Sequence, residues 1–259
     1  MDYKNLVVEI DQDIAFVSIN RPEKGNSLSD LTVSELLDFF SQKPSAVGAR
    51  AAILGGVGEK FFCAGSDIGD LMKKDVEGQS EGFSELSLMY EAIRKSQIIS
   101  IAAVQGLALG GGFGLAACCD IAIASRSARF GLPEINLGIA PMIVVLPVMR
   151  AIGMKQAFLL ASRGNIITAA EALEIGLISA IVEKGELDNE AKKIATELIE
   201  KSGIALELIK KGMQRVEEYN YVKAYEYLQD VITFSMSTED AKEGLSAFAE
   251  KRSPKWKHQ

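Results

Sequence analysis

Histidine is nearly absent from this chain of 259 residues, because His258 is the only one. This scarcity excludes Ser-His-Asp and Cys-His triads, HExxH zinc sites and three-histidine zinc sites. Any proton transfer near neutral pH therefore falls mainly to carboxylates, tyrosine, cysteine or lysine.

Cysteine is also scarce, and basic residues are outnumbered by acidic ones. Cys63, Cys118 and Cys119 form no CxxC pair, and an odd count with two adjacent members is a poor disulfide framework. We therefore expect reduced thiols in a cytoplasmic protein, and no metal site. The 28 basic residues face 35 acidic ones, for a net charge of −7. General binding to nucleic acid needs a basic surface, so we expect none.

The composition is that of an ordinary globular protein. Hydrophobic residues make up 48% and charged residues 24% of the chain. At ~150 residues per domain, the length suggests one large domain or two small ones, with a core that needs no disulfide. The first residues, MDYKNLVVEIDQD, have no apolar signal core, so we expect no secretory leader.

An uncharged run of 24 residues, from Ser96 to Cys119, is long enough to span a bilayer. It contains five glycines, including the triple glycine 110–112, which would weaken a membrane helix at its centre. We predict instead a buried strand over 98–106 and a helix over 112–119, joined by a glycine turn, and no membrane segment.

Short β-rich runs alternate with turns and helical segments in the amino-terminal half. Strands are predicted over 6–10, 14–20, 50–57 and 120–125, and a helix over 31–42. Near-continuous apolar strands joined by crossovers indicate an α/β core with both sheet faces covered. A capping box at 168–171 and a cap at 237–240 are predicted to begin later helices.

Two glycine-containing turns could present backbone amides to a ligand. In FFCAGSDI, residues 61–68, a strand ends at the phenylalanines and a turn follows at Ala64 and Gly65. In GLALGGGFG, residues 106–114, three glycines at a strand-to-helix junction let a ligand approach bare backbone at the positive end of a helix. Such N–H donors suit an oxyanion that develops on a carbonyl. The structural alternatives are a β-turn with Asp67 capping a helix, and close packing of helix on strand.

Glu134 is the only charged residue between Phe130 and Met149. A carboxylate in apolar surroundings has a raised pKa and can accept or donate a proton near neutral pH. The alternatives are a solvated loop glutamate or a glutamate at the start of a helix. The residues alone leave these possibilities open.

Six segments, in this order along nearly the whole chain, resemble motifs of the enoyl-CoA hydratase/isomerase family, also called the crotonase superfamily. Each motif alone is of moderate specificity, but six in register are hard to explain by chance. The segments are RPEKGNSLS (21–29), FFCAGSDI (61–68), IAAVQGLALGGGFGLAACCDIAIAS (101–125), ARFGLPEINLGI (128–139), ITAAEALEIGLISAIV (167–182) and EGLSAFAEKRSP (243–254).

The resemblance implies an architecture and a class of substrate. The fold would be α/β, with a crotonase-like spiral core of ββα units over 1–195 and a helical trimerisation region over 196–259. The assembly would be a homotrimer or a dimer of trimers. The substrates would be acyl-CoA thioesters, with coenzyme A as part of the substrate and no further cofactor.

The resemblance also assigns roles to residues that match the family's motifs. The backbone amides of Ser66 and Gly111 would hold the thioester oxygen while an enolate forms, with Glu134 as acid and base. The other implied substrate contacts are Lys24 near the phosphates of coenzyme A, the backbone around Ala64 and Ile68 at the adenine, Gly110, Pro133, and the tail residues Phe248 and Lys251.

Position 114 departs from the family's pattern. Hydratases of the family carry a second glutamate two residues after the triple glycine, where this chain has Gly114. A double-bond shift needs only one base, so we expect enoyl-CoA isomerisation with Glu134 alone. The alternatives are hydration with a substitute for the missing carboxylate, and a non-catalytic acyl-CoA binder. The polar segment 70–85 could form a mobile loop over the acyl pocket, and Tyr90 or Glu85 could then approach the substrate. The default expectation for both residues is the surface.

Overall fold

Two sheets form the framework of the first unit of the chain. The computed structural model describes residues 2–183, 185–217 and 219–258, and it divides into compact units over residues 1–195 and 196–259. In the described part, the larger sheet has the strand order β1 (Leu6–Asp11), β2 (Ile14–Ile19), β3 (Ala51–Gly56), β5 (Ile99–Val104), β7 (Ile121–Ser125) and β10 (Ala180–Val182). The smaller sheet has the order β4 (Phe61–Cys63), β6 (Leu107–Leu109), β8 (Arg129–Gly131) and β9 (Ile166–Thr168).

The larger sheet is parallel apart from one hairpin, which joins β1 to β2. Gln12 and Asp13 form the turn of this hairpin with φ values of 52° and 65°, the left-handed geometry that suits two-residue turns between twisted strands. Every residue of β5 is buried, as a parallel strand covered on both faces requires. The predicted α/β core is therefore confirmed.

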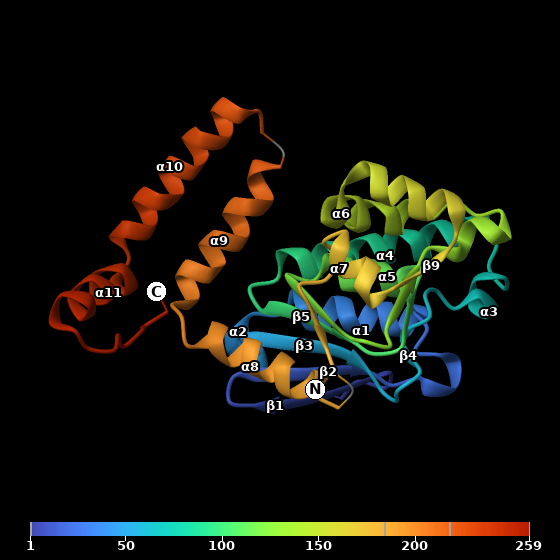
Figure 1. The fold of residues 1–259 in the computed structure, drawn as a ribbon, viewed down its shortest axis with the longest axis horizontal. Helices are drawn as coiled ribbons and strands as arrows, with labels where there is room; N and C mark the ends of the chain where they lie inside the picture. Colours follow the sequence, from blue (N-terminus) through green and yellow to red (C-terminus); the bar gives the residue numbers. More distant parts are fainter. Residues whose placement is uncertain (1, 184, 218, 259) are drawn as a thin grey trace. The chain divides into compact units, whose positions relative to one another are not determined.

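Helices pack on one another beside the sheets. Helix α1 (Asp30–Ser41) contacts α4 (Val76–Lys95), and α5 (Gly111–Cys118) contacts α6 (Met142–Arg163). Figure 1 shows α4, α5 and α6 grouped on one side of β2 and β3. The shorter elements are η1 (Pro22–Lys24), α2 (Pro44–Val47), α3 (Ile68–Leu71), η2 (Pro133–Leu137), α7 (Ala169–Glu174) and α8 (Leu187–Ile199).

Most local predictions agree with these elements. The uncharged run 96–119 forms β5 and α5, as predicted, and the segment between them adds the short strand β6. Thr168 caps α7 through both hydrogen bonds of the predicted capping box. Thr238 supplies the predicted cap of α11 (Glu239–Glu250), because its side chain accepts a hydrogen bond from the amide of Ala241.

The prediction of a loop over 70–85 is wrong. Helix α4 begins at Val76 directly after Asp75, whose side chain accepts a hydrogen bond from the amide of Gly78 at 2.9 Å. This cap and a buried apolar stripe on α4 outweigh the low helix propensity of the glycines. Tyr90 belongs to the buried stripe and is not a surface residue, whereas Glu85 is exposed as expected.

Helix α6 is, in the part of the chain that the structure describes, the one helix long and apolar enough by length and composition to cross a membrane. Gly153 interrupts it with φ 78° and ψ 160°, and Pro147 lies inside it. The interruption divides α6 into two pieces, each shorter than the ~20 residues that a membrane helix needs.

The second unit is helical, with α9 (Gly203–Val216), α10 (Tyr221–Ser237) and α11. Helices α9 and α10 contact each other, and both expose large apolar side chains, among them Met213, Val222 and Phe234. The predicted trimerisation through this unit, and the choice between a trimer and a dimer of trimers, stay predictions.

The side chain of Asn26 anchors loop 21–29 to the segment that joins β3 to β4. Its side chain is fully buried, and its oxygen accepts a hydrogen bond from the amide of Arg21 at 3.0 Å. Its Nδ2 donates to the carbonyls of Val57 and Phe61, at 3.1 and 2.8 Å. Loop 21–29 is thereby held against the segment that leads into β4.

We expect Asn26→Ala to lower the free energy of unfolding by about 2 kcal/mol, because it leaves buried backbone groups without partners. Urea denaturation would measure the change. Gln105→Ala is the matched control, because Gln105 also donates an amide hydrogen bond to a carbonyl, that of Gly58, but in an exposed position. Equal losses in the two variants would contradict the assignment.

Candidate active site

A largely apolar cavity of about 460 Å³ opens where three of the predicted segments meet. Its walls come from the turn at 64–66, from α3 and α4, from Gly110, and from η2, the start of α6 and the segment between them. Its volume lies in the usual range of roughly 300–1,000 Å³ for small-molecule sites. Among the described residues that line it, Glu134 is the only carboxylate.

The amide of Ser66 is turned toward this cavity by strand-like pairing on its other side. Ser66 forms an isolated parallel bridge with Leu28, in which the amide of Leu28 donates to the carbonyl of Gly65 and the amide of Asp67 donates to the carbonyl of Leu28. In parallel pairing these bonds use the neighbours of Ser66, so the N–H of Ser66 itself points away from Leu28. Gly65 permits the turn, because its φ of 97° is a value that other residues rarely adopt.

The amide of Gly111 lies beside that of Ser66, at the first residue of α5. Gly110 precedes it with φ 50° and ψ −119°, and first-turn N–H groups have no partner inside their helix. A Cβ built on Gly111 would lie 3.5 Å from the nitrogen of Ser66. Among the described residues, neither amide has a hydrogen-bond acceptor. The two amides therefore form a pair of neighbouring donors at a helix N-terminus.

The carboxylate of Glu134 reaches the same place from η2. Its Oε1 lies 2.6 Å from the position that a Cβ on Gly110 would take, next to the Gly111 amide. Its Oε2 is buried and has no hydrogen-bond partner within the described residues. Burial raises the pKa of Glu134 above its ordinary value, which makes it a stronger base when ionised. Carboxylate and paired amides can thus serve as a base facing an oxyanion site.

Tyr90 is the residue that sequence reasoning placed wrongly. Its hydroxyl donates a hydrogen bond to the carbonyl oxygen of Gly111 at 2.8 Å, and burial raises its pKa well above the ordinary value, so the donor stays protonated. A Cβ on Gly114 would lie 2.5 Å from the hydroxyl oxygen of Tyr90. The spacing of Leu86, Met89, Tyr90 and Ile93 is the signal that could have revealed its burial.

An ion pair stabilises the turn that carries Ser66. Arg21 Nη2 lies 2.9 Å from Asp67 Oδ2, and both side chains are mostly buried. Burial acts to raise the pKa of Asp67, but the hydrogen bond from Arg21 and that from the amide of Asp70 hold it below its ordinary value. Asp67 also caps α3. The structural alternative for residues 61–68, in which Asp67 caps a helix, is therefore correct. The same turn also directs the amide of Ser66 away from Leu28.

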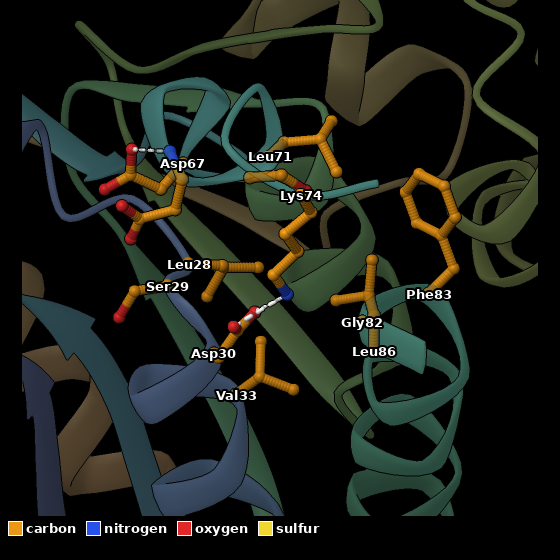
Figure 2. A pocket seen from close by; sticks show the side chains of 12 residues that line it. Leu28, Ser29, Asp30, Val33, Asp67, Leu71, Lys74, Gly82, Phe83 and Leu86 are labelled. Atoms are coloured by element: carbon orange, nitrogen blue, oxygen red, sulfur yellow. Dashed lines mark hydrogen bonds and ion pairs between the residues drawn. The ribbon is translucent and has the colours of Figure 1, made fainter. Parts of the chain in front are cut away.

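A smaller pocket of about 40 Å³ adjoins the large cavity and shares Ser66, Leu71, Phe83 and Leu86 with it. Figure 2 shows Lys74 extending to Asp30 across this pocket, with Phe83 and Leu86 of α4 beside it. The two charges are 2.7 Å apart. The partly exposed pair contributes little stability alone, but it joins the α3–α4 connection to the start of α1.

The other residues predicted to contact the substrate lie in different parts of the chain. Ala64, Ile68, Gly110 and Pro133 line the cavity. Lys24 is exposed on η1, and the neighbouring Gly25 accepts a hydrogen bond from the amide of Ala64 at 2.9 Å. Phe248 lies on α11 and Lys251 caps its end, both in the second unit. Their contacts with coenzyme A stay predictions.

Fold and cavity together describe an α/β protein with one carboxylate and a pair of main-chain donors at a largely apolar cavity. The family model for enoyl-CoA hydratase/isomerase matches residues 9–259. The chain is 37% identical to the short-chain-enoyl-CoA hydratase of Clostridium acetobutylicum over 257 residues, which is 97% of each chain. It is 34% identical to the crotonyl-CoA hydratase of Syntrophomonas wolfei over 255 residues, again 97% of each chain.

Solved structures agree with these matches. The enoyl-CoA hydratase from Bacillus anthracis superposes with a TM-score of 0.94 at 32% identity, covering 99% of this chain and 100% of that one. The chain therefore belongs to the enoyl-CoA hydratase/isomerase family, is an enzyme that acts on acyl-CoA, and has the predicted crotonase-type α/β fold. Membership of a family of enzymes sets aside the non-catalytic binder.

The raised pKa of Glu134 has a consequence for stability that Glu134→Gln would reveal. A carboxyl whose folded-state pKa is raised above its ordinary value of 4.5 stabilises the protein below that value, and this stability is lost as the pH rises through the raised pKa. Since glutamine cannot ionise, we expect the variant to match the wild type near pH 4.5 and to be more stable at ~pH 8.

Urea denaturation at the two pH values would measure this difference. Glu85→Gln, on the exposed face of α4, is the control and should show no such pH-dependent gain. A Glu134→Gln protein that is less stable than the wild type at the higher pH would refute the desolvated carboxylate.

Proposed function

We propose that this enzyme shifts the double bond of 3-enoyl-CoA thioesters to the conjugated 2-enoyl position. The observation that carries the proposal is that Glu134, the one carboxylate among the described residues that line the cavity, lies beside Gly110, which directly precedes the Gly111 amide next to that of Ser66. Tyr90 fills the place beside Gly114, and within the described part of the chain the cavity lining holds no carboxylate besides Glu134.

The chemistry needs one base and one oxyanion site. The thioester oxygen would accept hydrogen bonds from the amides of Ser66 and Gly111, while Glu134 removes a proton from C2. The resulting dienolate spreads its charge from the oxygen to C4. Return of the same proton to C4 by Glu134 leaves the double bond between C2 and C3. Acid and base are then one group used twice.

Hydration of 2-enoyl-CoA is the second candidate, favoured by the names of the relatives, which are a short-chain-enoyl-CoA hydratase and a crotonyl-CoA hydratase. Water would add its hydroxyl to C3 and a proton would go to C2. Glu134 would have to deprotonate the water and deliver the proton, because residue 114 has no side chain to share these tasks.

Isomerisation can be followed with 3-hexenoyl-CoA, because the conjugated product absorbs more strongly in the ultraviolet. We expect Glu134→Gln to lower kcat by at least about 10²-fold, the usual contribution of a general acid–base group. Circular dichroism would show that the variant is folded, and Glu85→Gln is the control for loss of a carboxylate elsewhere. An unchanged rate in Glu134→Gln would remove the proposed base.

The two candidate reactions can be separated on the same preparation. We expect hydration of crotonyl-CoA, measured as loss of conjugated absorbance, to be about 10²-fold slower than isomerisation of 3-hexenoyl-CoA, because one acid–base group is missing. Comparable rates, or faster hydration, would favour the second candidate and contradict the first.

A further inference from the structure

Tyr90 links α4, which forms part of the cavity wall, to the backbone carbonyl of Gly111. On α4, Phe83 and Leu86 line the cavity, and Tyr90 lies one turn beyond Leu86. Only 6% of Tyr90 is exposed to solvent. Its hydroxyl extends to α5 and donates to the carbonyl oxygen of Gly111 at 2.8 Å. A side chain of one helix thus holds the carbonyl group of Gly111, the first residue of another, whose own N–H is the proposed donor.

Gly111 has no side chain of its own that could fix its backbone. It lies in a run of three glycines, whose backbone has more conformational freedom than that of any other residue type. Gly110 is held on one side, because its amide donates to the carbonyl of Gly131 at 2.9 Å. On the other side, the hydroxyl of Tyr90 donates a hydrogen bond to the carbonyl of Gly111. A Cβ on Gly111 would lie 3.5 Å from both the Tyr90 hydroxyl and the Ser66 nitrogen.

The same phenol fills the space next to Gly114. A Cβ there would lie 2.5 Å from the hydroxyl oxygen, 2.8 Å from the ring carbon that bears it, and 3.1 Å from Val144 Cγ1. Contacts under 3.0 Å force the neighbour to move. Any side chain at position 114 would therefore push the hydroxyl of Tyr90 off the carbonyl of Gly111.

We propose that Tyr90 is a positioning residue, which orients the Gly111 amide toward the thioester oxygen and requires position 114 to be glycine. Tyr90 does not touch the substrate and transfers no proton. It acts by holding the backbone of Gly111, and it thereby ties the oxyanion site to the presence of a single carboxylate. The inference rests on the proposed function, because it assigns Gly111 as an oxyanion donor.

Enolisation of bound acetoacetyl-CoA tests this role without turnover. The enolate of this thioester absorbs in the near ultraviolet, and oxyanion donors raise the ratio of enolate to neutral ligand. The ratio is measured at fixed pH in the Glu134→Gln protein, so that neither turnover nor the charge of Glu134 contributes. Adding Tyr90→Phe should lower the ratio about fivefold, the effect of one lost hydrogen bond.

Two measurements separate positioning from a general loss of structure. Tyr3→Phe is the matched control, because the Tyr3 hydroxyl donates to Asp38 at 2.6 Å and lines no part of the cavity, so its loss should leave the ratio unchanged. Calorimetry with coenzyme A alone should give the same dissociation constant with and without the Tyr90 hydroxyl. If the protein promotes enolisation but Tyr90→Phe leaves the ratio unchanged, the inference is overturned while the proposed function stands.

Failure of the proposed function has a different signature. If the Glu134→Gln protein holds acetoacetyl-CoA with the same enolate ratio as free ligand, the amides of Ser66 and Gly111 do not form an oxyanion site. The proposed function and the inference would then fall together.

Gly114→Ala keeps Tyr90 in the chain, so it tests the inference even if Tyr90→Phe folds poorly, and a double-mutant cycle adds a second test where both variants fold. Alanine is the better helix former inside a helix, so a loss caused by Gly114→Ala cannot be blamed on helix propensity. We expect Gly114→Ala to lower the enolate ratio at least as much as Tyr90→Phe does. The double variant should be no worse than Gly114→Ala alone, because the hydroxyl is already displaced. Fully multiplicative losses would mean that the two residues act independently, which would overturn the inference.

Discussion

The site depends on a close approach of two stretches of bare backbone. The turn after β4 lies against the start of α5, where a Cβ on Gly112 would be 2.1 Å from the carbonyl oxygen of Cys63 and one on Gly65 would be 2.9 Å from that of Leu109. Only glycine allows this contact. It explains both alternatives raised for the triple glycine, because Gly112 serves the packing of helix on strand while Gly110 lines the cavity and Gly111 lies beside the amide of Ser66.

The carboxylate of Glu134 lies where its charge is poorly solvated, which costs stability but raises its pKa. Its Oε2 is buried without a partner among the described residues, and its pKa is raised because burial disfavours the charge. Two other acidic side chains of the unit that are mostly buried do have partners, because Asp67 pairs with Arg21 and Glu35 accepts hydrogen bonds from two backbone amides. A deliberate exception at a cavity wall is typical of functional sites, where stability and activity oppose each other.

Much of this could be predicted from the residues, for identifiable reasons. Strand periodicity, the capping box at Thr168 and the glycine-rich turns are local signals, and each forms the element that its pattern indicates. The prediction of a loop over 70–85 is wrong because the glycines and charges of this segment favour a loop, whereas Asp75 caps a helix that begins at Val76. The partnership of Tyr90 with Gly111 was not predictable, because it joins residues 21 positions apart that meet only through the packing of α4 on α5.

The contact between Gly114 and Tyr90 also limits the paths by which this lineage can diverge. Any substitution that adds a side chain at 114 while the phenol is in place meets it at about 2.5 Å. A smaller residue at position 90 would remove this conflict, but under our proposal it would also leave the Gly111 amide less well held. A second acidic group at position 114 is therefore expected to arise together with a change at position 90.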